Sequence, residues 1–133
     1  MSWPQINTSN LNPGPLGIVG AGGTVSATGV VCQLGAGAGN PTLTQVKRST
    51  VILDGTNATT SAVTASIWTW DSVRGAWVTG TFNYTDLLVN YGSISVTAGT
   101  SQVFGLNFPF EGLQVQISAI GGGTFTAVIL GCA

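Results

Sequence analysis

Three tryptophans in the segment SIWTWDSVRGAWV are the side chains best suited to bind a ligand. Trp68 and Trp70 alternate along an expected strand and therefore share one face, and Trp77 follows an expected hairpin turn, where it would be their cross-strand neighbour. Aromatic rows on a β-face can stack on sugar rings, and neutral amide and hydroxyl side chains suit sugar hydroxyls. The same indoles could instead fill the core of a β-sandwich or contact another subunit. Trp68, Trp70 and Trp77 are thus a candidate glycan platform, with core packing and subunit contact as alternatives.

The chain has few groups for acid-base or nucleophilic catalysis. It contains no histidine, which removes the usual general base and the commonest metal ligand. Of its four carboxylates, Asp54, Asp71 and Glu111 stand beside turn residues, so we expect turn-forming or surface roles. A glycosidase pair among them is the alternative. We expect a protein that is not an enzyme, with no catalytic residue, no metal site and no cofactor.

The two cysteines, Cys32 and Cys132, form no CxxC pattern, so neither a disulfide scaffold nor a zinc site is encoded. A bridge between them would close a loop of about 100 residues and would stabilise the fold. In a reducing cytoplasm two free thiols are the expected state.

Charge is scarce along the whole sequence. Only 5% of the 133 residues are charged, against about 25% in a typical domain, and the net charge is -1. Lys47 and Arg48 form the only basic pair, so we expect no nucleic-acid partner. A surface of neutral hydroxyls and amides gives a lone monomer little colloidal stability. We infer that other subunits cover much of this surface.

Two uncharged segments, residues 16–39 and 112–133, are long enough to cross a bilayer. Both are dense in Gly, Thr, Ser and Gln and alternate with a period of two, so we expect strands and no membrane contact. The start, MSWPQINTSN, lacks the basic and apolar regions of a secretory signal. We therefore expect a chain that is made in the host cytoplasm, is not exported by a signal peptide, and reaches its final location by assembly into a larger particle.

From residue 24 onward, short β-like runs alternate with turn sequences such as DGTN, DSVRG and AGTS. The runs cover residues 24–34, 44–53, 62–70, 76–84, 93–97, 102–106, 113–119 and 124–130. About eight short strands without a helical period predict an all-β, antiparallel β-sandwich that is jelly-roll-like. Only residues 84–91 could form a helical turn. Residues 1–23 carry three prolines and many glycines and predict an extended N-terminal arm, which leaves 24–133 as the β-sandwich domain.

The segment LQVQISAIGGGTFTAVIL, residues 113–130, predicts a β-hairpin closed by a triple-glycine turn. Its alternation directs one set of side chains to the core, namely Leu113, Val115, Ile117, Phe125, Ala127 and Ile129. The outward set carries no charge and consists of Gln114, Gln116, Ser118, Thr124 and Thr126.

Several side chains are candidates for contact with other subunits or a capsid. Pro109 in FGLNFPFEG separates two strands, and Phe110 enters either the core or a neighbouring subunit. An indole on an arm is a natural anchor for a neighbour's pocket. The candidate interface residues are Trp3, Phe108, Phe110, Gln114 and Gln116.

The segment SVTAGTSQVFGLNFPFEGLQVQISAIGGGTFTAVILG resembles the C-terminal half of small β-sandwich virion proteins of tailed bacteriophages, the capsid decoration and cement type. The preceding VILDGTNATTSAVTASIWTWDSVRGAWV is similar to their earlier strands, so the resemblance covers residues 44–131. It implies a structural virion protein that binds the assembled phage head and stabilises or coats it. The implied partners are the major capsid protein and copies of itself, as a trimer or another small homo-oligomer. The alternative is a glycan-binding head-fibre or tail module that recognises the host surface.

Overall fold

The computed structural model describes residues 18–35, 48–84, 87–106 and 110–132. Within these ranges every regular element is a strand, and the strands pair antiparallel. The strands are β1 Ile18–Val25, β2 Gly29–Gly35, β3 Arg48–Asp54, β4 Val63–Asp71, β5 Ala76–Val78, β6 Thr81–Tyr84, β7 Leu87–Asn90, β8 Ile94–Val96, β9 Ser101–Leu106, β10 Gly112–Ala119 and β11 Phe125–Cys132.

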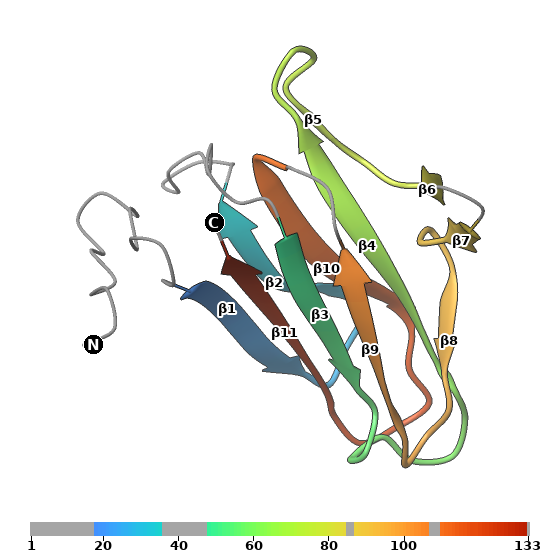
Figure 1. Cartoon of the computed structure of the whole chain (residues 1–133). Coiled ribbons are helices and arrows are strands. Elements are labelled where there is room, and N and C mark those ends of the chain that lie inside the picture. Colours follow the sequence, from blue (N-terminus) through green and yellow to red (C-terminus); the bar gives the residue numbers. More distant parts are fainter. Residues whose placement is uncertain (1–17, 36–47, 85–86, 107–109, 133) are drawn as a thin grey trace.

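The strands form two stacked layers (Figure 1). One is a four-stranded sheet in the order β1-β11-β3-β9, and the other is a five-stranded sheet in the order β2-β10-β4-β5, in which β8 also pairs with β4. Strands β6 and β7 pair with each other in a small separate sheet. The predicted all-β antiparallel sandwich is confirmed, with eleven strands in the described ranges where about eight were expected. The jelly-roll connectivity stays a prediction.

The core lies between the two sheets and is built from alternate residues of their strands. All six predicted core residues of β10 and β11 are at most 2% exposed. The largest fully buried side chains come from both layers: Phe125, Leu53, Ile67, Leu113, Ile129, Val51, Val63, Val96 and Val115. Burial of each such side chain contributes about 1.5 to 3 kcal/mol, so this shared interior holds the sheets together.

The predicted hairpin of β10 and β11 is wrong. Strand β10 pairs with β2 and β4, whereas β11 pairs with β1 and β3, so the two strands lie in opposite sheets. The triple glycine therefore carries the chain from one layer to the other. Gly123, with φ +74°, leaves room for Asn57 and Ala58, and it forms a β-bridge with Ala58. Alternation places the same side chains inward in either arrangement, which is why the sequence pattern did not distinguish them.

The predicted boundary at residue 23 also differs from the structure. Residues 18–23, assigned to the arm, belong to β1 and pair with β11, and the predicted run 24–34 is divided between β1 and β2. A Cβ on Gly23 would lie 2.1 Å from the carbonyl oxygen of Val31, so this glycine lets β1 and β2 approach closely. Gly20, Gly22 and Gly23, which contributed to the predicted arm, are instead strand residues that lie close to neighbouring strands. Residues 1–17 lie outside the described residues.

Two further predictions change near β5. The predicted run 76–84 divides into β5 and β6, because the chain leaves β4 after Val78 and the carbonyl of Gly80 accepts a 2.9 Å hydrogen bond from Tyr91 N–H. The possible helical turn at 84–91 is instead largely strand β7, paired with β6. Pairing satisfies backbone groups that an isolated helical turn would leave open.

Candidate functional site

The outward residues of the five-stranded sheet bring together two sets of predicted site residues. Cross-strand register places Gln114 of β10 between Gln33 of β2 and Trp68 of β4. We call this surface the amide–indole face; its residues are Gln33, Ser66, Trp68, Trp70, Trp77, Gln114 and Gln116. The glycan candidates thus lie on the same side of the sheet as Gln114 and Gln116, although they come from separate segments of the sequence. Gln114 is 4% exposed, so of these two interface candidates only Gln116 is accessible to a partner.

Three glutamines form a chain of hydrogen bonds across this face. Gln116 Nε2 donates to Gln114 Oε1 at 2.5 Å, and Gln114 Nε2 donates to Gln33 Oε1 at 2.8 Å. Gln33 Nε2 donates in turn to the carbonyl of Gly35 at 3.4 Å. Gln114 is only 4% exposed, so its amide needs these partners. None of the seven residues of the amide–indole face is charged, so hydrogen bonds between neutral groups order its polar part.

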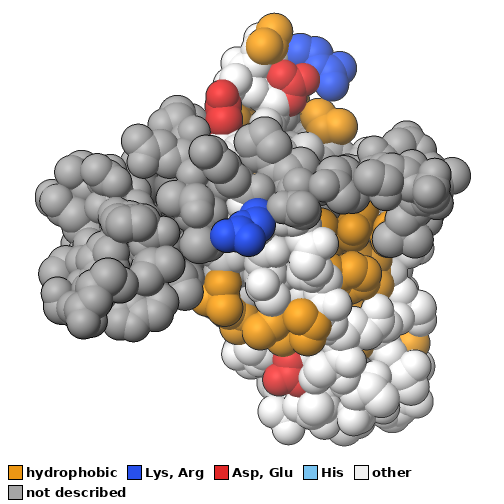
Figure 2. Space-filling model, viewed as in Figure 1, with side chains coloured by type: hydrophobic (Ala, Val, Ile, Leu, Met, Phe, Trp, Pro, Cys, Tyr) orange, Lys and Arg blue, Asp and Glu red, His pale blue; other side chains and the backbone are white. Residues whose placement is uncertain are grey.

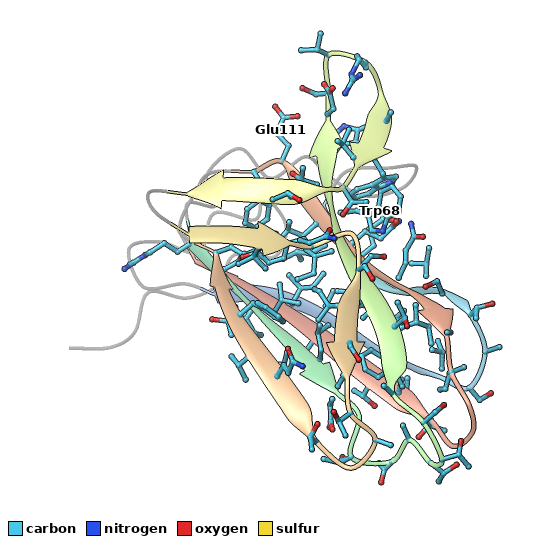
Figure 3. All side chains as sticks on the ribbon, turned by 90° about the vertical axis from the view of Figure 1, so that its right-hand side faces the viewer. Trp68 and Glu111 are labelled. Atoms are coloured by element: carbon cyan, nitrogen blue, oxygen red, sulfur yellow. The ribbon has the colours of Figure 1, made fainter. Side chains whose placement is uncertain are left out.

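Trp68 is oriented by a bond to its own strand. Its indole Nε1–H donates to Ser66 Oγ at 2.8 Å, and Ser66 Oγ–H donates to the carbonyl of Gln116 at 3.4 Å. Figure 3 shows Trp68 and Glu111 on opposite sides of β4 in that view. Because the indole N–H is already used, Trp68 offers a partner its ring rather than a hydrogen-bond donor.

Trp70 and Trp77 form an aromatic pair, as predicted from their spacing. They are direct partners across β4 and β5, with ring centroids 5.2 Å apart and an interplanar angle of 63°. The prediction that Trp77 is also the cross-strand neighbour of Trp68 is wrong, because the pairing of β4 with β5 covers only residues 69–71 and 76–78. All three indoles are half-buried. They pack on the outside of the sheet and do not fill the core between the layers.

The turn between β4 and β5 holds this pair in register. Asp71 Oδ1 accepts from the backbone N–H of Val73 at 3.0 Å and of Arg74 at 3.2 Å, and its Oδ2 accepts from Arg74 Nε at 2.6 Å. The hydrogen bond from the Arg74 side chain is the main reason that the pKa of Asp71 lies below its usual value. Gly75, with φ +67°, closes the turn. The predicted turn-forming role is confirmed for Asp71.

Asp54 has a similar role at the end of β3. Its Oδ1 accepts hydrogen bonds from the backbone N–H of Thr56 at 2.9 Å and from its hydroxyl at 2.6 Å, and from the Ser101 hydroxyl at 3.0 Å. In the part of the chain that the structure describes, no group of three His, Cys, Asp or Glu side chains could hold a metal ion. Glu111 differs, because its Oε2 is buried without a hydrogen-bond partner.

The other predicted interface residues have different outcomes. Phe110 is 6% exposed and belongs to the core, so its assignment to a subunit interface is wrong. Burial of its ring between the sheets is the alternative that the sequence left open. Trp3 and Phe108 lie outside the described residues.

The cysteine prediction is confirmed for Cys32, which is a free, buried thiol in β2. Burial raises the pKa of this thiol to about 12. The side chain of Cys132 is not among those described. As to membranes, no helix with the length and apolarity of a span occurs among the residues described.

A second surface was missed by sequence reasoning. The outward face of the four-stranded sheet carries an apolar band of Ile52, Val103, Val128 and Leu130, of which Val103 is 65% exposed and Leu130 38%. Figure 2 shows apolar side chains crossing this face, with basic and acidic side chains on opposite sides of them. The available signal was the uninterrupted apolar run VIL in both β3 and β11, which marks strands that are apolar on both faces.

Comparison with known proteins supports the fold. The crystal structure of the SPBc2 prophage-derived protein YomS is similar over 86% of this chain and 94% of that chain, with a TM-score of 0.52 and 12% sequence identity. The structure of pili that form Bacillus endospore appendages covers 90% of this chain and 91% of that chain at 18% identity, but its TM-score of 0.40 carries no argument. No protein-family model and no curated protein sequence matches the chain. The chain thus shares the sandwich fold of a protein encoded by a prophage.

Proposed function

We propose that this chain is a structural protein of a bacteriophage particle, of the capsid decoration or cement type. Its partners are the major capsid protein and further copies of itself, and its place is the virion. The observation that carries the proposal is the chain of amides from Gln33 through Gln114 to Gln116, which makes an extended sheet face polar without charge. The shared fold with a prophage-derived protein is in keeping with this role.

An uncharged face suits permanent contact with other subunits. Ions must lose their hydration when an interface closes, and their pairing often does not repay that cost. Neutral amides and hydroxyls lose less and still form directional hydrogen bonds. A protein that binds only the assembled shell then shifts the equilibrium against disassembly by mass action.

The proposal includes the absence of catalysis. Asp54 and Asp71 are both occupied by the turns that follow them, and the sequence has no histidine to serve as a base. This arrangement favours structural roles for these carboxylates over acid-base chemistry.

Immunogold electron microscopy tests the proposal. Antibodies raised against the purified protein are applied to phage particles induced from the organism that encodes the chain. We expect labelling over the head surface, and protein in the particle fraction rather than in the cell extract. Absence of the protein from purified particles would overturn the proposal, and labelling confined to tails would favour the second candidate below.

The second candidate is a glycan-binding head-fibre or tail module. It is favoured by the presence of three half-buried indoles beside the glutamine row on one face. Aromatic faces stack on the apolar faces of sugar rings, and the adjacent amides can bind hydroxyl groups. A host surface glycan would then lie along β4, across Trp68 and Trp70.

Tryptophan fluorescence with isolated host polysaccharide tests this candidate. Saturable quenching and a blue shift are expected for the natural chain, and both should be lost in Trp68→Ala. Trp70→Phe, which keeps an aromatic face, is the matched control and should retain most of the response. If polysaccharide leaves the emission unchanged at every concentration, the face is not a sugar platform.

A further inference from the structure

The outward face of the four-stranded sheet has three cross-strand rows, each perpendicular to the strands. The middle row is apolar and joins Gly22, Val128, Ile52 and Val103. The row beside it joins Gly20, Leu130, Thr50 and Gly105, and the row on its other side joins Thr24, Thr126, Asp54 and Ser101. Arg48 lies beyond the Thr50 row, at the other end of β3 from Asp54. The face is therefore an apolar centre between a cation and an anion.

Gly105 on this face is required neither by a positive φ nor by a close contact among the described residues. A Cβ built on it would meet nothing within 4 Å, and its φ is not among the positive values. Glycine weakens a strand interior, and where the fold does not require it, it often marks the close approach of another backbone. Val103 lies two residues away on the same face of β9. Its β-branched side chain is 65% exposed and projects from the surface, whereas Gly105 leaves an open position.

We propose that two copies of this chain associate face to face through this surface. The two copies are related by a two-fold axis that lies in the plane between the two sheets, runs perpendicular to the strands, and is level with Val51. This axis reverses the strand direction and keeps each strand over its counterpart in the second copy. The Ile52 row of one copy then meets the Thr50 row of the other. Val103 lies over the open position at Gly105, and Val128 lies over Leu130.

The positions of Arg48 and Asp54 agree with this two-fold rotation. Arg48 and Asp54 are six residues apart on β3, about 20 Å, and are equidistant from Val51. The axis therefore places each Arg48 opposite the partner copy's Asp54, so one interface contains two such pairs, as an isologous contact requires. An axis along β3 would instead place Arg48 over Arg48. Strand directions that stay nearly aligned also agree with the usual packing of sheet on sheet.

The size of the face sets the expected strength. Four strands spaced about 4.8 Å apart and about 20 Å long offer roughly 400 Å² of flat area per copy, which is about half of what each partner buries in a stable specific interface and is in the range of weak, transient contacts. We therefore expect a reversible dimer with a dissociation constant above about 1 µM. The proposal goes beyond the virion role, because it specifies a self-association surface that purified protein would show without any particle.

Sedimentation equilibrium of the full chain from micromolar to millimolar concentration tests the inference. We expect a monomer–dimer equilibrium in the natural chain and a dissociation constant raised at least tenfold in Gly105→Val. This substitution fills the open position but should leave the melting temperature unchanged or higher, because a β-branched residue suits a strand. Arg48→Glu, which places Glu opposite Asp54, should also weaken the dimer, most strongly at low salt.

Val73→Ser is the matched control for Val103→Ser, because it distinguishes loss of a dimer contact from a general loss of folding. Both remove an exposed valine, but Val73, 93% exposed, lies in the β4–β5 turn and away from the proposed interface. Only Val103→Ser should weaken the dimer. The inference is overturned if the natural chain is monomeric up to about 1 mM, or if Gly105→Val and Val103→Ser leave its association constant unchanged. Particle labelling by immunogold is measured separately, so either proposal can fail alone.

Discussion

The indole of Trp77 meets the indole of Trp70 edge-on across the short β4–β5 pair, with ring centroids 5.2 Å apart. Strand β5 has only three residues, so few backbone hydrogen bonds attach it to the sheet. The aromatic contact therefore has an important part in holding this edge in place.

We expect Trp77→Ala to lower the free energy of unfolding through loss of this contact. An edge-to-face pair contributes about 0.5 to 1.5 kcal/mol beyond its buried area. A double-mutant cycle with Trp70→Ala, measured by urea unfolding, should give a coupling energy in that range. Trp77→Phe is the control and should keep a substantial part of it. A coupling energy of zero would mean that the two rings do not stabilise each other.

Ile117→Asp should prevent folding. Ile117 is 2% exposed between the sheets, where a carboxylate has no partner to offset its desolvation. Ser118→Asp, at the exposed next position on β10, is the matched control and should unfold cooperatively like the natural chain. Circular dichroism during heating distinguishes the two. A normal thermal transition in Ile117→Asp would show that the strand register is wrong.

Gly123→Ala should destabilise the chain more than Gly99→Ala. Both glycines have positive φ, +74° and +85°, so alanine is strained at each by about 1 kcal/mol. At Gly99 a Cβ would meet nothing within 4 Å, whereas at Gly123 it would lie 2.1 Å from the carbonyl oxygen of Asn57. The difference between the two unfolding free energies thus isolates the backbone clash at the crossover between sheets. Equal losses would contradict the close approach of Gly123 to Asn57.

The stability contributed by Asp54 should disappear in acid. Hydrogen bonds from the hydroxyl and then the backbone N–H of Thr56 hold the pKa of Asp54 below its ordinary value of 3.8. A carboxyl group with a lowered folded-state pKa stabilises the fold above the unfolded pKa, and this contribution is lost as pH falls through the folded pKa. Asp54→Asn keeps the Oδ1 acceptor but has no charge. The urea midpoint of this variant should lie below that of the natural chain at about pH 7, and the difference should vanish near about pH 2. A difference in urea midpoint that does not depend on pH would refute this explanation.

The Cys32 thiol should be inert in the folded protein. Its pKa of about 12 leaves almost no thiolate near neutral pH, and its side chain is 6% exposed. In a Cys132→Ser variant, a thiol reagent should modify no residue at about pH 8 until urea unfolds the chain. The Cys32→Ser, Cys132→Ser double variant provides the blank. Fast modification of the native Cys132→Ser variant would show that β2 opens readily.

The sequence by itself determined which side chains face inward, because alternation along a strand is a local property of an extended backbone. Leu113, Val115 and Ile117 on β10 and Phe125, Ala127 and Ile129 on β11 are all buried as their pattern predicts. The sequence also identified Trp70 and Trp77 as cross-strand partners, because residues at equal distances before and after a tight turn lie opposite each other. Both inferences use only residues that are close together in the sequence.

Only the tertiary structure decided which strands lie side by side. The same alternation in β10 and β11 fits a hairpin or two facing sheets, and competition among distant strands selected the latter. Phe110 was likewise undecided between core and interface until the layers closed over it. The three rows of the outer face, and the opposition of Arg48 and Asp54 across an apolar centre, arise because β1, β11, β3 and β9 are neighbours in space and not in sequence. Pairing of this kind depends on the total burial that the whole chain achieves, and no local pattern encodes it.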